Sequence, residues 1–224
     1  MTTAHYTPEV RINHSLTAVL EKRALIWMAH RAPGWVTSDQ LTGLGLLAQV
    51  AAGVCYAFAA RDRRLLLVGI LCIAANCLVD SLDGTLARVR NQQRPRYGFY
   101  VDHMADLFGS LALMGGLALS GFLHPATASL MLVAFLLLSG DSYLATHTVG
   151  RFHLSQGVFG PTEIRLLLCL GNLVLLHSPW CTVAGHPWLL FDLGGIIASV
   201  GMFAMAMFST LRHAGELSRQ EPLP

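Results

Sequence analysis

Four aspartates stand close together in the sequence, between two long runs of apolar residues. Asp80 and Asp83 are three residues apart, and Asp102 and Asp106 are four residues apart. If both segments are helical, each pair shares one face, because residues three or four apart are neighbours on a helix. The loop between the pairs, residues 89–97, is short enough to bring the two helix ends side by side. The spacing therefore predicts that all four carboxylates converge on one point.

Converging carboxylates offer the hard oxygen ligands that two Mg²⁺, Mn²⁺ or Ca²⁺ ions require. Two such ions about 4 Å apart can stabilise both the attacking and the leaving oxygen of a phosphoryl transfer. Divalent cations would also offset the cost of an unpaired charge in a membrane, at least about 2.5–3.5 kcal/mol. A structural carboxylate–arginine network is the alternative, but one nearby arginine leaves most of the acidic charge unpaired. We therefore expect metal-dependent chemistry.

Small residues and one arginine accompany the first aspartate pair. Gly84 follows Asp80 by four residues and Ala87 follows Asp83 by four, so both lie on or near the carboxylate face. Their small size lets a bulky ligand approach the helix backbone. Arg88 can form bidentate hydrogen bonds to a phosphate. The combination indicates a site for a nucleotide diphosphate.

The composition is that of an integral membrane protein. Only 12% of the 224 residues are charged, against about 25% in an ordinary soluble domain. Hydrophobic residues make up 54% of the chain, and the mean hydropathy is +0.52. A net charge of +2 gives no reason to expect a nucleic-acid partner. The polar N-terminal residues do not resemble a secretory signal peptide.

Six segments are candidates for membrane-spanning helices, each of which needs about 20 mostly apolar residues. They cover about residues 41–60, 65–86, 100–123, 126–148, 164–176 and 189–211. Residues 15–31 are predicted to form an amphipathic helix in the headgroup region, or alternatively a helix packed on the end of the bundle. The predicted fold is all-α and polytopic, with an N-terminal segment 1–36, a six-helix domain 37–214 and a tail 215–224.

Basic residues are distributed unequally between the two sides that six spans define. Twelve lysines and arginines fall on the side that holds both termini, and three, Arg61, Arg63 and Arg64, fall on the other. The excess marks the first side as cytoplasmic. The aspartates lie on that side, so the expected active site faces the cytoplasm, with a bacterial inner membrane as the expected location. Arg90, Arg94 and Arg96 are interpreted as a solvated face for lipid headgroups.

The pattern Asp80-x-x-Asp83-Gly84-x-x-Ala87-Arg88 and, after nine residues, Gly98-x-x-x-Asp102-x-x-x-Asp106 resembles the signature of the CDP-alcohol phosphotransferase (CDP-alcohol phosphatidyltransferase) family. The resemblance implies a six-helix membrane enzyme, usually a homodimer. Such an enzyme moves a substituted phosphate from a CDP-alcohol donor to an acceptor hydroxyl and releases CMP. Its expected partners are these two substrates and membrane lipids.

The resemblance also implies a role for each residue of the pattern. Asp80, Asp83 and Asp102 correspond to the main ligands of two divalent cations, Mg²⁺ or Mn²⁺, whose sites Ca²⁺ can also occupy. Asp106 corresponds to the residue that completes the second metal site and takes the proton of the acceptor hydroxyl.

Four further residues of the pattern correspond to nucleotide-binding positions. By the same resemblance, Gly84 and Ala87 pack against the cytidine nucleotide. Arg88 contacts the diphosphate, and Gly98 gives room near the nucleotide.

Several residues outside the pattern are weaker candidates. Thr42 or Asp39 is a candidate nucleotide contact, with simple capping of a helix as the alternative. Glu163 and Arg165 open the fifth span and are candidates for lining the site, or for an ordinary helix start. His147 and Arg151 end the fourth span, where they could meet an anionic group. Asp141, within that span, is either functional or a structural hydrogen-bond partner.

The favoured donor is CDP-diacylglycerol, because the chain is compact and its cytoplasmic loops are short. The alternative is a CDP-choline or CDP-ethanolamine donor with a lipid hydroxyl as acceptor, because Asp102-His103 and Gly160-Pro-Thr-Glu163 are similar to that branch of the family. A cation transporter or channel is a distant alternative. Gly84, Ala87 and Arg88 would have no role in a cation path, and the carboxylates lie near one surface.

Overall fold

The computed structural model describes residues 16–148, 161–183 and 185–221 and contains seven helices and a β-hairpin in these ranges. The helices are α1 (Leu16–Arg31), α2 (Ser38–Phe58), α3 (Leu65–Val89), α4 (Pro95–Leu119), α5 (Pro125–Thr148), α6 (Pro161–His177) and α7 (Leu190–Gln220). The hairpin consists of β1 (Trp180–Val183) and β2 (His186–Leu189).

The prediction of a helical, polytopic membrane protein is confirmed. Within the described residues, four helices are long and apolar enough to cross a membrane, namely α2, α3, α5 and α7. Of the other two predicted spans, α4 carries Asp102 and Asp106 in its first half and α6 has 17 residues. That all six of these helices span the membrane stays a prediction.

Two features of the chain were not predicted from the sequence. The segment between α6 and α7 forms an antiparallel hairpin in which Trp180 pairs with Leu189. Its strands have four residues each, too few for the alternation that would identify them in a sequence. Helix α7 also continues through residue 214, the predicted end of the domain, to Gln220.

A capping box starts α2 at the predicted position. The Thr37 hydroxyl accepts a hydrogen bond from the backbone N–H of Gln40 (3.2 Å), and the Gln40 side chain accepts one from the Thr37 N–H (2.9 Å). These bonds satisfy two of the donors that a helix N-terminus leaves open, so the first turn of α2 is held in place. This turn also carries residues of the candidate site.

Helices α2 and α4 touch through their backbones. A methyl group added at Gly53 would meet the carbonyl oxygen of Ala112, and one added at Gly116 would meet the backbone of Gly53. Glycine at these places permits the close approach, which resembles the small-residue contacts common between membrane helices. Further along the same interface, Tyr56 of α2 and Leu117 of α4 are fully buried in the main core.

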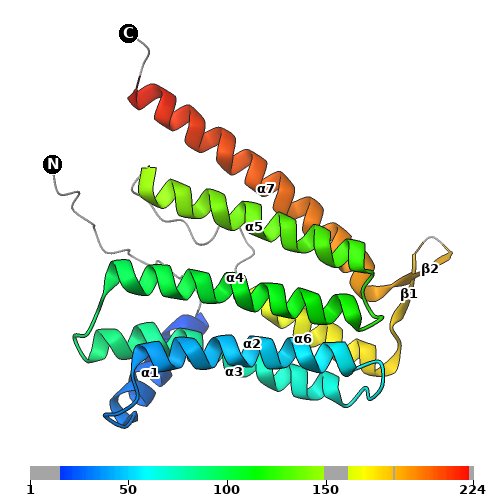
Figure 1. Ribbon diagram of the computed structural model, residues 1–224, viewed down its shortest axis with the longest axis horizontal. Coiled ribbons are helices and arrows are strands. Elements are labelled where there is room, and N and C mark those ends of the chain that lie inside the picture. Colours follow the sequence, from blue (N-terminus) through cyan, green and yellow to red (C-terminus); the bar gives the residue numbers. More distant parts are fainter. Residues whose placement is uncertain (1–15, 149–160, 184, 222–224) are drawn as a thin grey trace.

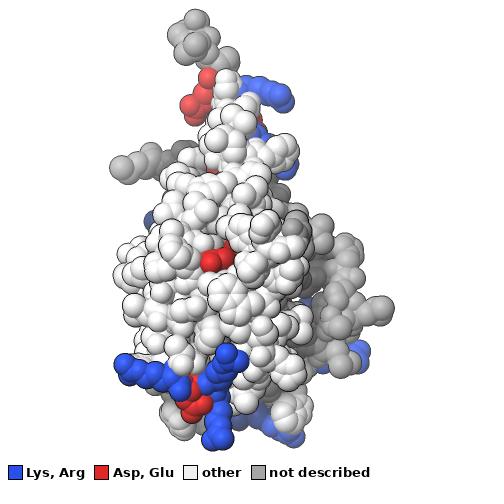
Figure 2. Space-filling view, turned by 90° about the vertical axis from the view of Figure 1, so that its right-hand side faces the viewer, with Lys and Arg blue, Asp and Glu red and all other residues white. Residues whose placement is uncertain are grey.

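The helices form two groups (Figure 1). Helix α2 packs between α3 and α4, with α1 and α6 against α3, while α5 and α7 pack on each other and meet the first group through α4. The loop between α2 and α3, which carries Arg61, Arg63 and Arg64, lies at the end of the bundle opposite the loop between α3 and α4. Figure 2 looks onto the end that carries the loop between α2 and α3, where most of the surface is white, with Lys and Arg gathered around an acidic group at the lower edge and one acidic group near the centre.

Candidate functional site

Three of the four predicted aspartates line one narrow crevice between α2, α3 and α4. Asp80 comes from α3, and Asp102 and Asp106 come from α4. The crevice has space of about 10 Å³, which is about the volume that one water molecule needs. Among the described residues, no three His, Cys, Asp or Glu side chains stand close enough together to hold a metal ion as they are placed here.

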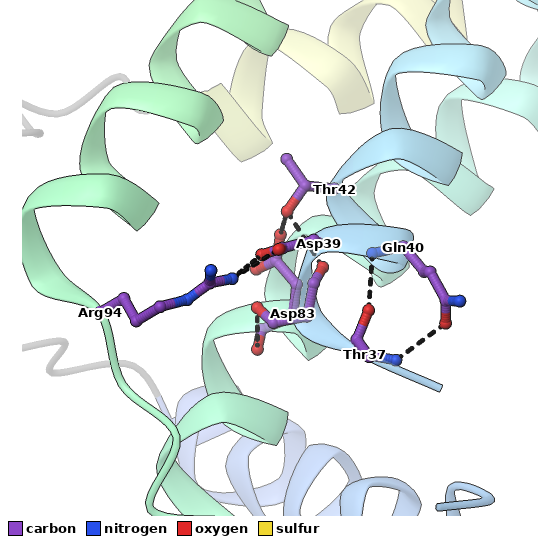
Figure 3. Close-up of polar contacts among 7 residues, drawn as sticks. Thr37, Asp39, Gln40, Thr42, Asp83 and Arg94 are labelled. Carbon is purple, nitrogen blue, oxygen red and sulfur yellow. Dashed lines mark hydrogen bonds and ion pairs between the residues drawn. The ribbon is translucent and has the colours of Figure 1, made fainter. Parts of the chain in front are cut away.

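Asp83, the fourth aspartate, is buried and bound to the start of α2. Its Oδ2 accepts a hydrogen bond of 2.7 Å from the hydroxyl of Thr42, and its Oδ1 accepts one from the N–H of Gly84. The hydroxyl of Ser38 donates to the Asp83 carbonyl oxygen at 3.0 Å. Figure 3 shows Thr42 above Asp83, on the turn of α2 that the capping box starts. Thr42, a weak candidate from the sequence, thus contacts a predicted metal ligand directly.

Arg165 reaches the crevice from α6. Its Nη1 donates a hydrogen bond of 2.9 Å to Oδ2 of Asp80, and its Nη2 lies 3.9 Å from Oδ1 of Asp106. The arginine side chain is 16% exposed, so this guanidinium is largely shielded from solvent. The structure therefore places one positive charge between two of the predicted metal ligands. Sequence reasoning marked Arg165 as a candidate but gave it no particular partner.

A separate, wider cleft of about 380 Å³ lies where the first turn of α2 faces the end of α3 and the loop before α4. Its lining comprises Thr37, Ser38, Asp39, Leu86, Ala87, Gln92, Gln93 and Arg94. Of the predicted nucleotide-binding residues, Ala87 is in this lining. Arg88 is exposed one residue further on and donates a hydrogen bond to Thr85 at 3.1 Å. Gly84 lies beside the Arg88 side chain, and Gly98 is exposed with open space at its Cα.

An ion pair between Arg94 and Asp39 lies at this cleft (Figure 3). Both residues are about half-exposed, and the hydrogen bonds from Arg94 to Asp39 raise the pKa of the guanidinium. Arg94 also stacks over the Tyr97 ring, 4.1 Å from its centroid. Arg94 is exposed, in agreement with its interpretation as part of a solvated face, but it also has a partner on α2, 55 residues away in sequence, that the sequence did not indicate.

Arg90 fixes the connection between α1 and α2. Its guanidinium donates hydrogen bonds to the carbonyl oxygens of Val36 (2.5 Å), Ala32 (2.9 Å) and Pro33 (2.9 Å). This connection leads directly into Thr37, so Arg90 holds the α2 side of the cleft against the end of α3. Arg90, which was interpreted as part of a solvated face, is instead half-buried and bound to carbonyl oxygens of the chain itself. No local sequence signal could have identified carbonyl oxygens so distant in the chain.

The remaining candidates lie elsewhere or outside the described residues. His147 is exposed at the end of α5, with its ring centroid 6.2 Å from that of Phe99. Arg151 lies outside the described residues, and Glu163 belongs to the first turn of α6 but its side chain is not described. Next to Asp102, the His103 ring stacks on Phe99 and meets Tyr143 of α5 edge-on, while its Nδ1 donates to the Phe99 carbonyl oxygen at 2.7 Å.

Asp141 links α5 to α7 rather than joining the other aspartates. Its carboxylate accepts hydrogen bonds from the hydroxyls of Ser209 (2.5 Å) and Thr210 (3.1 Å), and Nδ1 of His213 lies 3.4 Å away. Hydrogen bonds of this kind join membrane helices. Of the two interpretations of Asp141 from the sequence, the structural one agrees with these contacts.

Comparison with known proteins identifies a family and several similar solved structures. The sequence profile described as CDP-alcohol phosphatidyltransferase matches residues 35–211. The chain is similar to the crystal structure of phosphatidylinositol phosphate synthase from Mycobacterium tuberculosis with CDP-DAG bound, at 22% identity and a TM-score of 0.54, covering 90% of this chain and 92% of that one. The apo form of the same synthase matches at 23% identity and a TM-score of 0.53, covering 88% and 92%. A search of curated protein sequences finds no match.

Proposed function

Because the chain belongs to the CDP-alcohol phosphatidyltransferase family, we propose that it transfers the phosphatidyl group of CDP-diacylglycerol to the hydroxyl of a small polar acceptor. The chain is a transferase of phospholipid synthesis and an integral, multi-pass membrane protein. The choice of donor is supported by the bound CDP-DAG in the mycobacterial synthase, whose fold the chain shares over most of its length.

One observation carries the proposal: Asp80, Asp102 and Asp106 line one crevice, and Ala87, two turns beyond Asp80 on the same helix α3, lines a separate cleft. A donor nucleotide in the cleft would place its diphosphate toward the carboxylates, because Ala87 and Asp83 lie one helical turn apart on α3. Gly84 and Ala87 present little side chain to such a ligand, and Arg88 can bind its phosphates. Gly98 leaves open space at the start of α4.

The donor set of the crevice suits divalent cations. Asp80, Asp83, Asp102 and Asp106 would hold two Mg²⁺ or Mn²⁺ ions, or Ca²⁺ in their place, since carboxylate oxygens are the ligands that these ions prefer. When bound, the ions neutralise the charge that develops on the phosphate oxygens during transfer. Thr42 keeps Asp83 oriented through its 2.7 Å hydrogen bond.

In the proposed reaction, the acceptor oxygen attacks the β-phosphorus of the donor, which carries the diacylglycerol. The bond from that phosphorus to the oxygen bridging it to the α-phosphate breaks, and CMP leaves with this oxygen. Asp106, at the crevice, takes the proton of the acceptor hydroxyl. The phosphatidyl group ends on the acceptor, so the product is a phospholipid.

We further propose six membrane-spanning helices, α2 to α7, with the aspartates on the cytoplasmic side of a bacterial inner membrane and a homodimer as the assembly. Residues 1–36 would form the interfacial segment, 37–214 the catalytic domain and 215–224 the tail. The orientation is supported by the lysines and arginines. With six spans, most of them fall on the same side of the membrane as the aspartates.

A CMP-release assay tests the proposal. Purified protein in liposomes with Mg²⁺ or Mn²⁺ is given CDP-diacylglycerol and, one at a time, glycerol phosphate, inositol phosphate, inositol and serine. We expect CMP with CDP-diacylglycerol and one of these acceptors. Release only from CDP-choline or CDP-ethanolamine with diacylglycerol would instead establish the second candidate, which is favoured by His103 beside Asp102 at the crevice. No CMP from any pair would overturn both.

A further inference from the structure

Arg165 lies close to two of the proposed metal ligands, Asp80 and Asp106. It reaches from α6 to α3 and α4 and contacts Asp80 at 2.9 Å and Asp106 at 3.9 Å. Both carboxylates are more exposed than the guanidinium, at 29% and 36% against 16% for Arg165. The arginine therefore approaches the two acids from the protein side of the crevice and leaves their other edges facing the open side.

Asp83 and Asp80 accept hydrogen bonds from different kinds of donor. Asp83 is held by uncharged donors, the hydroxyl of Thr42 and the N–H of Gly84. Asp80, by contrast, uses its Oδ2 atom for the guanidinium of Arg165. A cation that uses both oxygens of Asp80 would therefore compete with Arg165 for Oδ2.

We propose that Arg165 is an internal counter-ion, which neutralises Asp80 and Asp106 in the metal-free protein and releases them when divalent cations bind. The inference rests on the proposed metal site. Its physical basis is that close carboxylates repel one another, so a cluster without cations is unstable unless a positive group replaces them. Arg165 supplies that group from a neighbouring helix, and its guanidinium stays protonated at every accessible pH.

Two consequences follow from this competition. The metal-free protein is more stable with Arg165 than without it, because the arginine offsets the repulsion between the acids. Divalent cations bind less tightly with Arg165 present, because its contact with Asp80 must be broken and its positive charge opposes theirs. A residue that merely helped to build the metal site would have the opposite effect on affinity.

Mn²⁺ binding to the detergent-purified chain tests the inference. The EPR signal of free Mn²⁺ is followed during titration of wild type, Arg165→Gln and Arg165→Lys, without substrates. We expect Arg165→Gln to bind Mn²⁺ about 3- to 10-fold more tightly than wild type, from the usual strength of a partly exposed ion pair. Arg165→Lys keeps the charge and should remain within about twofold of wild type.

Arg96→Gln is the matched control. It removes one positive charge from the same end of the bundle, but Arg96 is exposed on the first turn of α4. Its Mn²⁺ affinity should stay within about twofold of wild type, because solvent and salt screen exposed charges. Thermal unfolding in EDTA gives the second readout. Here Arg165→Gln should melt about 2–4 °C lower than wild type, and Mn²⁺ should raise its melting temperature more.

A measurement on the wild-type chain covers the case in which Arg165→Gln does not fold. Phenylglyoxal labelling of arginines, read by mass spectrometry, should increase several-fold at Arg165 when Mn²⁺ is added and stay constant at Arg96. Equal Mn²⁺ affinity of wild type and Arg165→Gln, weaker affinity of the variant, or unchanged labelling would overturn the inference while leaving the metal site intact. A wild-type chain that binds no Mn²⁺ would overturn the metal site and the inference together.

Discussion

The hydroxyl of Thr42 lies 2.7 Å from Oδ2 of Asp83, so the first turns of α2 hold a carboxylate of α3 in a fixed orientation. The backbone is tied in the same way, because Ser38 donates to the Asp83 carbonyl oxygen. Ser38 lies within the capping box of Thr37 and Gln40, and Thr42 follows it two residues later. The position of a predicted metal ligand therefore depends on how α2 begins.

Replacing Thr42 tests this dependence. Thr42→Val keeps the shape but removes the hydrogen bond, whereas Thr42→Ser keeps a hydroxyl. Since a hydrogen bond to a charged group contributes about 1.5–3 kcal/mol, CMP release by Thr42→Val should fall about 10- to 100-fold in kcat/KM. Thr42→Ser should stay within about threefold of wild type. Equal activities of the two variants would show that the hydroxyl does not support Asp83.

Loss of the carboxylates at the crevice should abolish turnover. Asp102→Asn removes a proposed metal ligand, and Asp106→Asn also removes the proposed base, a role that commonly contributes about 10²- to 10⁴-fold. Each variant should show no CMP release above background in the liposome assay. Asp141→Asn is the control, because Asp141 hydrogen-bonds α7 rather than the site, and it should retain most activity. Turnover by Asp106→Asn near the wild-type level would remove the proton-accepting role from Asp106.

Removal of divalent cations should stop the reaction reversibly. Treatment with EDTA is expected to reduce CMP release to background, and Mg²⁺ or Mn²⁺ added in excess of the chelator should restore it. The reason is that the uncompensated carboxylates repel the anionic donor diphosphate. Activity that persists after dialysis against EDTA, with metal content verified by mass spectrometry, would contradict the assignment of the four aspartates as metal ligands.

The backbone contact between α2 and α4 should be sensitive to a single methyl group. Gly116→Ala places a Cβ against the backbone of Gly53, where neither helix can yield without a shift. We expect a lower melting temperature and a lower yield of monodisperse protein. The neighbouring Gly115→Ala has open space at the same point and should be neutral or slightly stabilising, as alanine favours helix. Size-exclusion chromatography in detergent distinguishes the two.

Arg90 should affect donor binding more than the chemical step. Arg90→Ala removes three hydrogen bonds to the connection between α1 and α2, so the α2 wall of the cleft is no longer held against α3. We expect KM for the donor to rise about tenfold, for a loss of about 1.4 kcal/mol in binding, with kcat changed less. Arg96→Ala is the control and should leave both constants unchanged. An equal fall in kcat for Arg90→Ala would assign Arg90 to catalysis instead.

The sequence predicted the helices better than their contacts. The ranges 65–86 and 126–148 agree closely with α3 and α5, because each contains a long, mainly apolar stretch with clear turn signals at its ends. The range 189–211 stopped short of Gln220, because the polar residues that follow carry no apolar signal although they continue the helix. The short hairpin strands gave no usable pattern at all.

For the candidate site, the spacing of the aspartates predicted that all four would converge, and the structure brings three of them to one crevice, while Asp83 binds Thr42 of α2. Asp80, Asp102 and Asp106 share a crevice, as periodicity on two adjacent helices requires. The partners of Arg90, Arg94 and Arg165 could not be predicted, because each lies 54 to 85 residues away in sequence, on another element. Such pairs depend on how the helices pack, which a single sequence does not encode in any local pattern.

Helix α6 has 17 residues and at 1.5 Å per residue is about 26 Å long, shorter than the hydrocarbon core of a typical bilayer, about 30 Å. Its first turns, where Arg165 lies, meet the aspartates of α3 and α4. Within the described residues, α6 is therefore the shortest of the six proposed spans. A two-chained lipid donor could arrive by diffusion within the leaflet, turn only its headgroup inward and keep both acyl chains in the bilayer throughout the reaction.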